Sequence, residues 1–353
     1  MSAVLDPPAT RSSGAAPRSE GVWRAAWRRL RTDRVGVVSL AVVALFVLLI
    51  VLTASGIVAS GWQREFGVPS APPTFMGPAP PPAESGPIAA PSGPPIDISS
   101  VDPLAPRYKE WAERAAQYKT VETVRAQTLP FGADRLGRDV LAKALKGTQT
   151  SVFVGLLGAL VATVIGTVLG AVGGFFGGKI GDFLEWLYSV FTSIPDILLI
   201  LSFAVLFGRG IGSVAMILAL VGWTGLYRQV RAEFIKHATR DYVRSAEAIG
   251  ASAASRMFRH ILPNVSHVIL VRMSLLVVGF IKFEVILSYL GLGVGVDDVS
   301  WGTMLAEAQS ELILGYWWQL AAATAFMAVF VTAFSLMTDA LRDALDPKLR
   351  GAA

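Results

Sequence analysis

The stretch that decides the fold is Val35–Ser60, VGVVSLAVVALFVLLIVLTASGIVAS, which contains no charged side chain. A helix needs roughly 20 apolar residues to cross the hydrocarbon core of a bilayer, and this run is longer than that. Six arginines precede it, from Arg18 to Arg34. The apolar part of a signal peptide is only about 7–15 residues long. We therefore predict a retained first membrane span rather than a cleaved signal peptide.

The chain holds five more runs of membrane length. Its composition, with 53% hydrophobic and 16% charged residues and a mean hydropathy of +0.54, is typical of a membrane protein. Backbone groups in lipid must be hydrogen-bonded within their own segment, so these runs should be helices. The sequence predicts an all-α membrane protein with six transmembrane helices, the later five at about 151–176, 184–208, 211–229, 266–289 and 317–339.

Basic residues predict the orientation of these helices. They gather in the arm before the first span, in the 228–265 loop and in the tail beyond residue 340, all on one side of a six-span chain. Because basic loops remain on the cytoplasmic side, we expect cytoplasmic N- and C-termini. The net charge of +5 is then explained by membrane orientation, and no nucleic-acid partner is expected.

One basic group conflicts with this orientation, because it precedes the second span on the predicted outer side. It consists of Arg135, Arg138, Lys143 and Lys146. Asp134 and Asp139 offset part of its charge. We interpret 129–150 as an amphipathic segment that forms a short helix in the membrane interface.

The segment 61–128 is unlike the rest of the chain. Thirteen of the 20 prolines lie between Pro69 and Pro106, and runs such as Pro78–Pro82 favour extended polyproline conformations. Residues 108–128 are richer in Ala, Glu, Lys and Arg, which favours a helix. We interpret the segment as an outward linker with one surface helix. The alternative is a docking surface for a receptor protein or a partner subunit.

The sequence offers no convincing metal or nucleotide site. Cysteine is absent, and the three histidines have no ligand spacing, so no metal and no cofactor are expected. Residues 173–179 satisfy the nucleotide-loop pattern G-x-x-x-x-G-K, but Ile180 stands where Ser or Thr would bind Mg²⁺. The run also ends an apolar span and follows no strand. We expect its glycines to allow close helix packing instead.

The 242–264 loop, YVRSAEAIGASAASRMFRHILPN, lies between two membrane-length runs and is rich in alanine, a strong helix former. Gly250 allows a change of direction, and Pro263 is expected to stop a second short helix before the fifth span. Small side chains let such a helix enter a groove of a soluble partner. The alternative, an interfacial amphipathic helix, would favour bulky apolar anchors instead.

Three further stretches have local structural interpretations. Gly132–Leu141, GADRLGRDVL, reads as a turn and a helix start near Asp139. Leu287–Gly293, LSYLGLG, with Ser300–Gly302 beyond it, reads as a helix exit with glycine turns. Leu341–Arg350, LRDALDPKLR, reads as a charged helix end.

Together, in this order, the four motifs resemble the C-type permease subunit of bacterial dipeptide/oligopeptide ABC transporters. That family shows G-T-D-x-x-G-R-D-V-L, A-x-A-L-G-A-S…H-I-L-P-N, L-S-F-L-G-L-G with S-W-G beyond, and L-R-D-A-L-D-P-x-L-R. The match covers residues 131–350, with mild departures at Ala133, Ile249 and Tyr289. The segment 61–128 is longer than the family leads us to expect.

The resemblance implies a type I ABC importer permease core and a set of partners. These are a second homologous permease, two ATP-binding subunits and an extracytoplasmic substrate-binding protein, in the bacterial inner (plasma) membrane. The chain would perform no chemistry itself, and its ATPase-coupling residues would be Ala246, Glu247, Ala248, Gly250, Ala251, Leu262 and Pro263. Peptides are the implied substrates, with nickel chelates, glutathione-like molecules and modified peptides as alternatives.

The implied organisation divides the chain into six parts. We expect a cytoplasmic basic arm, a first transmembrane helix, a Pro-rich extracytoplasmic insert, an amphipathic segment, a permease core with the coupling loop at 242–264, and a cytoplasmic tail, at 1–34, 35–60, 61–128, 129–150, 151–345 and 346–353.

Three ionisable residues at membrane depth are candidates for the translocation pathway: Asp196, Lys282 and Glu284. Lys282 and Glu284 are two residues apart and do not share a helix face. Pro195 should kink the helix that carries Asp196. The alternative for all three is a place near a helix end or a structural pairing with another chain.

Two other classes of function remain open at this point. A secondary transporter would show inverted repeats with broken helices, and no such repeat is evident. A channel would need a filter loop, which the sequence does not show. Only the importer needs an ATPase partner, so co-purification separates the three classes.

Overall fold

The computed structural model describes residues 22–78, 102–117 and 124–345, which are helical apart from loops, with no strand among them. The helices are α1 Val22–Thr32, α2 Arg34–Ala54, α3 Tyr108–Gln117, α4 Val140–Phe176, α5 Gly178–Thr192, α6 Asp196–Phe207, α7 Ile211–Ala238, α8 Asp241–Ala248, α9 Ala253–Ser255, α10 Leu262–Tyr289, α11 Trp301–Ile313 and α12 Trp318–Leu345, with 3₁₀ turns at Thr74–Met76 and Ala105–Arg107 and a π-helical turn at Arg256–Ile261.

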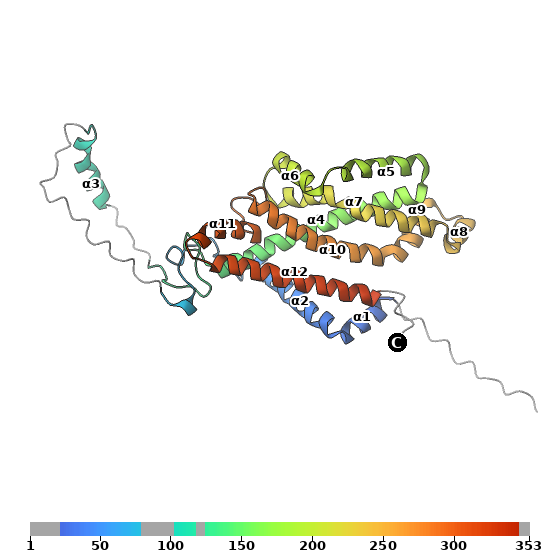
Figure 1. The fold of residues 1–353 in the computed structure, drawn as a ribbon, viewed down its shortest axis with the longest axis horizontal. Coiled ribbons are helices and arrows are strands. Elements are labelled where there is room, and N and C mark those ends of the chain that lie inside the picture. The colour runs from blue at the N-terminus through green and yellow to red at the C-terminus, as the bar shows by residue number, and fades with distance from the viewer. Residues whose placement is uncertain (1–21, 79–101, 118–123, 346–353) are drawn as a thin grey trace, which may run out of the picture.

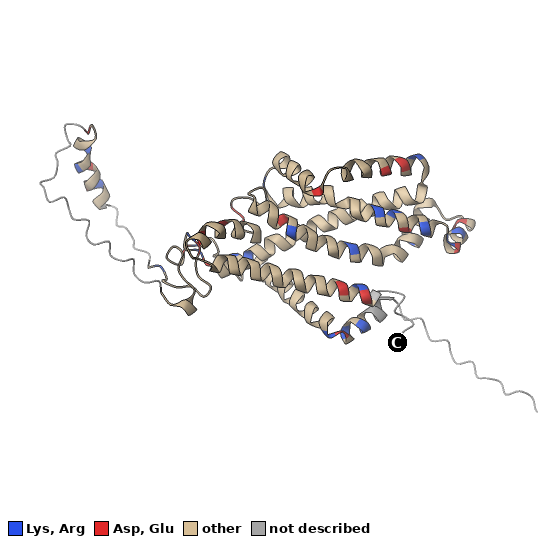
Figure 2. Ribbon diagram, viewed as in Figure 1, with Lys and Arg blue, Asp and Glu red and all other residues tan. Residues whose placement is uncertain are grey.

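The long helices run side by side, so the two ends of the bundle differ in what they carry (Figure 1). One end holds α1, the α8–α9 region and the C-terminal end of α12. The other end holds α11 and the loops before α4. Figure 2 shows Lys and Arg on α1 and α8, at the first of these ends. Basic residues of the arm and of the 228–265 loop therefore lie at the same end as the C-terminal end of α12.

Four helices in the described part of the chain are long and apolar enough to cross a membrane: α2, α4, α7 and α12. The pair α5–α6 also qualifies when it is taken together, but it bends by 85° at a short break. Pro195 fixes the backbone immediately before α6 and disfavours a helical conformation at Ile194. The expected third span is thus broken in two rather than kinked. The expected fifth span is covered by α10, which carries Arg272, Lys282 and Glu284.

Glycines allow α4 and α7 to form the most extensive helix pair of the bundle. Gly166, Gly170 and Gly174 recur every fourth residue of α4, on one face. A methyl group added at these positions would lie 2.7, 2.8 and 2.5 Å from carbonyl oxygens of α7. Gly174 belongs to the glycine-rich run at 173–179. It allows close packing of the two helix backbones, as the sequence predicts for that run. Gly178, by contrast, has no neighbour within 4 Å of an added methyl group.

We expect Gly170→Leu to prevent correct packing of α4 on α7. A built Cβ would lie 2.8 Å from the Tyr227 carbonyl oxygen, and a backbone cannot yield as a side chain does. The cost should be about 3 kcal/mol or more. Gly212→Leu on α7 is the control, because an added Cβ there meets nothing within 4 Å. Thermal unfolding of the two detergent-purified variants measures this, and equal stability would contradict the account.

Loops from both ends of the Pro-rich insert form a cap over the start of α4. Gly67 donates to the Gly137 carbonyl oxygen, and Ala133 donates to that of Ala71. Gly137 has φ +81°, and an added methyl group would collide with Gly67, so only glycine fits there. The segment between these anchored ends, 79–101, lies outside the described residues.

The segment 129–150 is not a separate interfacial helix. Residues 129–139 form turns of the cap, and α4 begins at Val140 and continues unbroken through Phe176. Asp139 caps that start by accepting from the Leu141 and Ala142 amides, as its place at the expected helix N-terminus suggests. The 37 residues of α4 therefore extend well beyond the roughly 20 that a bilayer needs.

Candidate functional site

The 242–264 loop turns sharply at Gly250. The amide of Ala251 donates to the Ala246 carbonyl oxygen at 3.0 Å, and that of Gly250 donates to the Glu247 carbonyl oxygen at 2.9 Å. These two bonds form a Schellman motif, which requires a left-handed residue after the helix. Gly250 supplies it with φ +86°. The change of direction expected from the sequence is therefore a capped end of α8.

After the turn the chain returns to the membrane without a stop at Pro263. Ser252 caps α9, a π-helical turn follows at Arg256–Ile261, and α10 begins at Leu262. The Leu262 amide donates to the Met257 carbonyl oxygen, five residues back. Pro263 then lies in the first turn of α10, where a missing amide hydrogen costs little. The expectation that Pro263 ends the second helix is wrong for this reason.

The loop is anchored to the bundle by one face. Val243 and Met257 are buried against residues of α4 and α7, among them Ala171, Val230 and Phe234. Of the expected coupling residues, Ala246 is buried and Leu262 packs against the same cluster. Ala246 is therefore shielded from a partner, and Leu262 is half-buried where it holds the loop in place.

The opposite face is exposed. It contains Glu247, Ala248, Gly250 and Pro263, with Ala251 half-buried beside them. The sequence interpretation missed the large apolar side chains of this face, Tyr242, Ile249 and Phe258, which are 38%, 85% and 49% exposed. Their signal was present in the sequence, as bulky apolar residues in a short loop otherwise made of small and charged ones. An exposed apolar patch with a polar rim is typical of a protein-binding surface.

One ion pair ties the two arms of the loop together and to α4. The guanidinium of Arg256 lies 2.6 Å from the Glu247 carboxylate and stacks 5.3 Å from the ring centre of Phe175. Phe175 is at the C-terminal end of α4. The outward tip of the loop is therefore joined to the longest helix of the bundle.

The motif before α4 builds a buried ionic network at the other end of the molecule. The ammonium of Lys143 is fully buried and lies 2.7 Å from the Asp134 carboxylate. It also contacts Glu307 of α11 and donates to Gln319 of α12 at 3.2 Å. Arg138 donates to the same Asp134 carboxylate at 2.7 Å. Two of the basic residues that conflict with the predicted orientation are thus neutralised inside the protein.

The carboxylates of this network have shifted pKa values. Burial alone would raise the pKa of Asp134, but the adjacent Lys143 ammonium and Arg138 outweigh burial and hold it below its usual value. Burial raises the pKa of Glu311, which accepts from the Arg135 amide at 2.9 Å. Asp134 therefore stays ionised well below neutral pH, and its pairing with Lys143 persists there.

The three expected pathway residues lie in different surroundings. Glu284 is fully buried and accepts from the Ser288 hydroxyl at 2.6 Å. Lys282 is exposed on another face of α10, in agreement with their spacing. Asp196 is exposed at the break between α5 and α6. Asp196 lines a pocket that neither Lys282 nor Glu284 lines, so the structure does not bring the three together there.

That pocket holds a second charge, which the sequence interpretation overlooked. It has a volume of about 200 Å³, lies between α6, α7 and α10, and is lined on its α10 side by Arg272. No hydrogen bond or ion pair within the described residues reaches the Arg272 guanidinium, and its Nε is buried. The missed signal was a third ionisable residue in the span that also carries Lys282 and Glu284.

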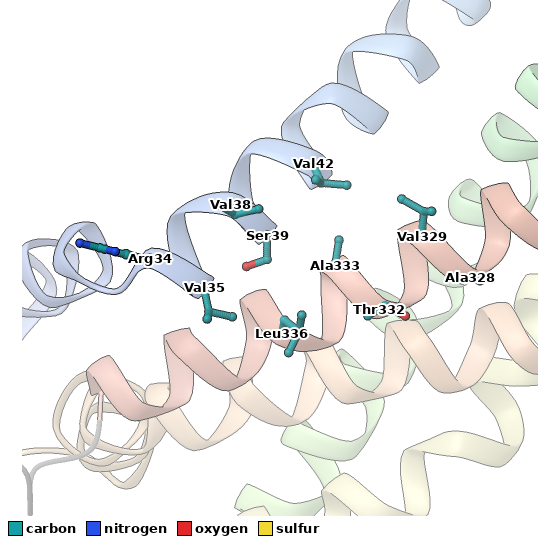
Figure 3. Close-up of a pocket in the computed structure, with 10 residues that line it drawn as sticks. All are labelled: Arg34, Val35, Val38, Ser39, Val42, Ala328, Val329, Thr332, Ala333 and Leu336. Carbon is teal, nitrogen blue, oxygen red and sulfur yellow. The ribbon is translucent and has the colours of Figure 1, made fainter.

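A larger hollow lies between α2 and α12, but it offers little to a polar solute. Its volume is about 630 Å³, and Figure 3 shows Val35, Val38, Val42 and Leu336 along its walls. Arg34 is its only charged lining residue and stands at one end. The smaller pocket, which has one carboxylate and one guanidinium, is the better candidate for solute recognition.

Two families match the sequence. Residues 162–351 match the model described as the binding-protein-dependent transport system inner membrane component. Residues 21–61 match the N-terminal TM domain of oligopeptide transport permease C. The first model covers the spans from within α4 to α12, and the second covers α1 and α2.

Several characterised proteins are similar to the chain. The dipeptide transport system permease protein DppC of Bacillus subtilis is 33% identical over 220 residues, 62% of this chain and 69% of that protein. The oligopeptide transport system permease protein OppC of Salmonella typhimurium is 40% identical over 220 residues, 62% and 72% of the two chains. The dipeptide transport system permease protein DppC of Lactococcus lactis is 29% identical over 330 residues, which are 92% of this chain and 90% of that protein.

Proposed function

Because the chain belongs to the family of binding-protein-dependent transport system inner membrane components, we propose that it is one membrane-spanning subunit of an ATP-driven peptide importer. The observation that carries this proposal is the anchored loop at 242–264, which presents a capped, apolar tip beyond the bundle. The peptide substrate rests on the relatives, which are named dipeptide, oligopeptide and di/tripeptide transport permeases.

The proposed topology has six spans with both termini in the cytoplasm. The passes are α2, α4, the broken pair α5–α6, α7, α10 and α12, which alternate in direction along the bundle (Figure 1). In support, the basic arm, the loop and the end of α12 lie at one end. Arg138 and Lys143 are held in ion pairs, so their charges no longer conflict with an outer position of this segment.

The loop at 242–264 is the proposed docking site for an ATP-binding subunit. Tyr242, Ile249 and Phe258 supply apolar contact area, and Glu247 with Arg256 forms a polar rim. When two ATP-binding subunits close on ATP, they would displace this loop and switch the pathway between outward- and inward-facing states. Among the residues expected from the sequence, Glu247, Ala248, Gly250 and Pro263 contact the partner, while Ala246 and Leu262 anchor the loop.

A second permease and an extracytoplasmic binding protein complete the proposed assembly. Large apolar side chains are exposed along α5 and α6, among them Phe183, Trp186, Val205 and Leu206. In a membrane these can face lipid or another subunit. The broken α5–α6 pair and the charged pocket lie on this side, so we place the second permease against it.

The test is purification of the tagged chain in mild detergent with its native partners, followed by peptide-stimulated ATP hydrolysis and peptide uptake in proteoliposomes. We expect a second permease and ATP-binding subunits to co-purify, and peptides to stimulate hydrolysis in the presence of the binding protein. Stimulation by a metal chelate but by no peptide would show that the proposed substrate is wrong, while the proposed importer would stand. A chain that moves solute alone, without an ATPase, would contradict the importer.

A further inference from the structure

A pair of opposite charges without partners lines the pocket between α6, α7 and α10. Asp196 stands in the first turn of α6, and Arg272 projects from α10 across α7. In the part of the chain that the structure describes, neither side chain has a hydrogen bond or an ion pair. An arginine is always ionised in a protein, and an uncompensated charge at membrane depth is costly to keep.

The pocket is shaped around the guanidinium. Gly225 of α7 lies directly beneath it, and an added methyl group there would be 2.7 Å from Nη2 of Arg272. Gly222 and Gly279 also line the pocket, and Thr224 adds one hydroxyl. Glycines leave room for the long side chain and expose backbone to a ligand. The glycines of α7 therefore leave space for the Arg272 side chain within the pocket.

The pocket lies at mid-length of the helices that form it. Its α7 residues run from Leu218 to Gly225 within Ile211–Ala238, and its α10 residues run from Arg272 to Phe283 within Leu262–Tyr289. The 85° break between α5 and α6 opens beside it. Apart from Thr224 the remaining side chains of the lining are apolar, and an apolar wall strengthens electrostatic contacts.

A peptide with free ends carries the complementary pair of charges, an α-ammonium and an α-carboxylate. We propose that Arg272 binds the carboxylate of the transported peptide and that Asp196 binds its ammonium as the peptide passes through the membrane. Arginine suits a carboxylate because its fork of donors can bond both oxygens. This proposal rests on the proposed function, since it names how the importer recognises its peptide.

The experiment crosses two variants with three peptides in the reconstituted importer with its binding protein. The peptides are one dipeptide with free ends, its N-acetyl form and its C-terminal amide. We expect R272Q to slow uptake of the free and acetylated peptides about tenfold or more, and to leave the amide within about twofold of the wild-type rate. D196N should slow the free and amidated peptides and spare the acetylated one.

Controls separate recognition from folding. K146Q removes a positive charge from α4, outside the pocket, and should leave all three rates unchanged. R272K keeps the charge and should retain about a third or more of the wild-type uptake of the free peptide. Each rate is compared with the wild-type rate for the same peptide, so selection by the binding protein cancels.

Two results would overturn the proposal, and they are distinguishable. If each variant slows all three peptides by the same factor, the charges serve folding or pair with the second permease, while peptide import stands. If the wild-type importer takes up no peptide in any form but remains coupled to another solute, the proposed substrate fails and the recognition fails with it.

Discussion

Replacement of Gly250 by valine should uncouple ATP hydrolysis from peptide transport while the subunit still inserts into the membrane. At φ +86°, a β-branched side chain is strained by about 1–2 kcal/mol, and the two bonds that cap α8 form only in this conformation. The tip of the loop would then leave the orientation that the ATP-binding subunit requires. We expect peptide-stimulated hydrolysis to fall about tenfold, since 1.4 kcal/mol corresponds to a factor of ten.

The structure provides a matched control at the end of α11. There Gly315 has φ +88°, and the Gly315 and Tyr316 amides make the same two capping bonds, to Leu312 and Glu311. In both turns an added methyl group would meet nothing within 4 Å, so backbone strain is the effect that the two substitutions share. Gly315→Val should reduce thermal stability similarly but keep coupling. Gly250→Asn, which tolerates this backbone conformation, should retain most activity.

Equal coupling in the two valine variants would show that the α8 turn is not the contact that transmits motion. A Gly250→Val protein that is missing from the membrane would point to a folding role instead. The amount of inserted subunit, measured in the same vesicles, therefore accompanies every hydrolysis rate.

Removal of the Lys143 ammonium should cause a large loss of stability, because this ammonium is fully buried among its partners. Lys143→Met leaves two carboxylates, those of Asp134 and Glu307, with Arg138 as their one remaining shared cation. Loss of one partner from a buried ion pair costs about 3–5 kcal/mol, most of it the penalty of the charge that remains. We expect a clear fall in the thermal unfolding temperature of the purified assembly.

Lys146→Met is the matched control, three residues further along α4. Its ammonium is half-buried and bonds only the neighbouring Gln149 side chain, so the same substitution should change stability little. A second variant tests the cause. Lys143→Met combined with Glu307→Gln leaves Asp134 paired with Arg138, removes the carboxylate in excess and should recover more than half of the lost stability. No recovery would mean that packing of the lysine stem, and not its charge, matters at this site.

Much of the fold follows from the sequence because membrane spans depend on local properties. The uncharged run that begins at Val35 is helical as far as Ala54, six residues short of the predicted end at Ser60. The start of α4 at Val140 follows from Asp139, whose side chain caps it. Gly250 marked a turn because few other residues adopt its conformation. In each case the deciding interaction is within a few residues of the chain.

What the sequence could not predict depends on distant contacts. Arg272 lies 76 residues after Asp196 in the chain, and only the fold brings it to the pocket of Asp196. Lys143 looked like a misplaced outer charge until α11 and α12 supplied its partners. Pro263 was expected to end a helix, because a π-helical turn that admits it has no recognisable sequence pattern.

The length of α4 has a mechanical consequence. At about 1.5 Å per residue, its 37 residues form a rod of roughly 55 Å, close to twice the thickness of the hydrocarbon core. Lys143 clamps one end of that rod, and Phe175, beneath Arg256, lies at the other. A continuous helix of this kind acts as a lever with its fulcrum in the membrane. We therefore expect a small push at the tip of the 242–264 loop to tilt the cap over the start of α4, without any rearrangement in between.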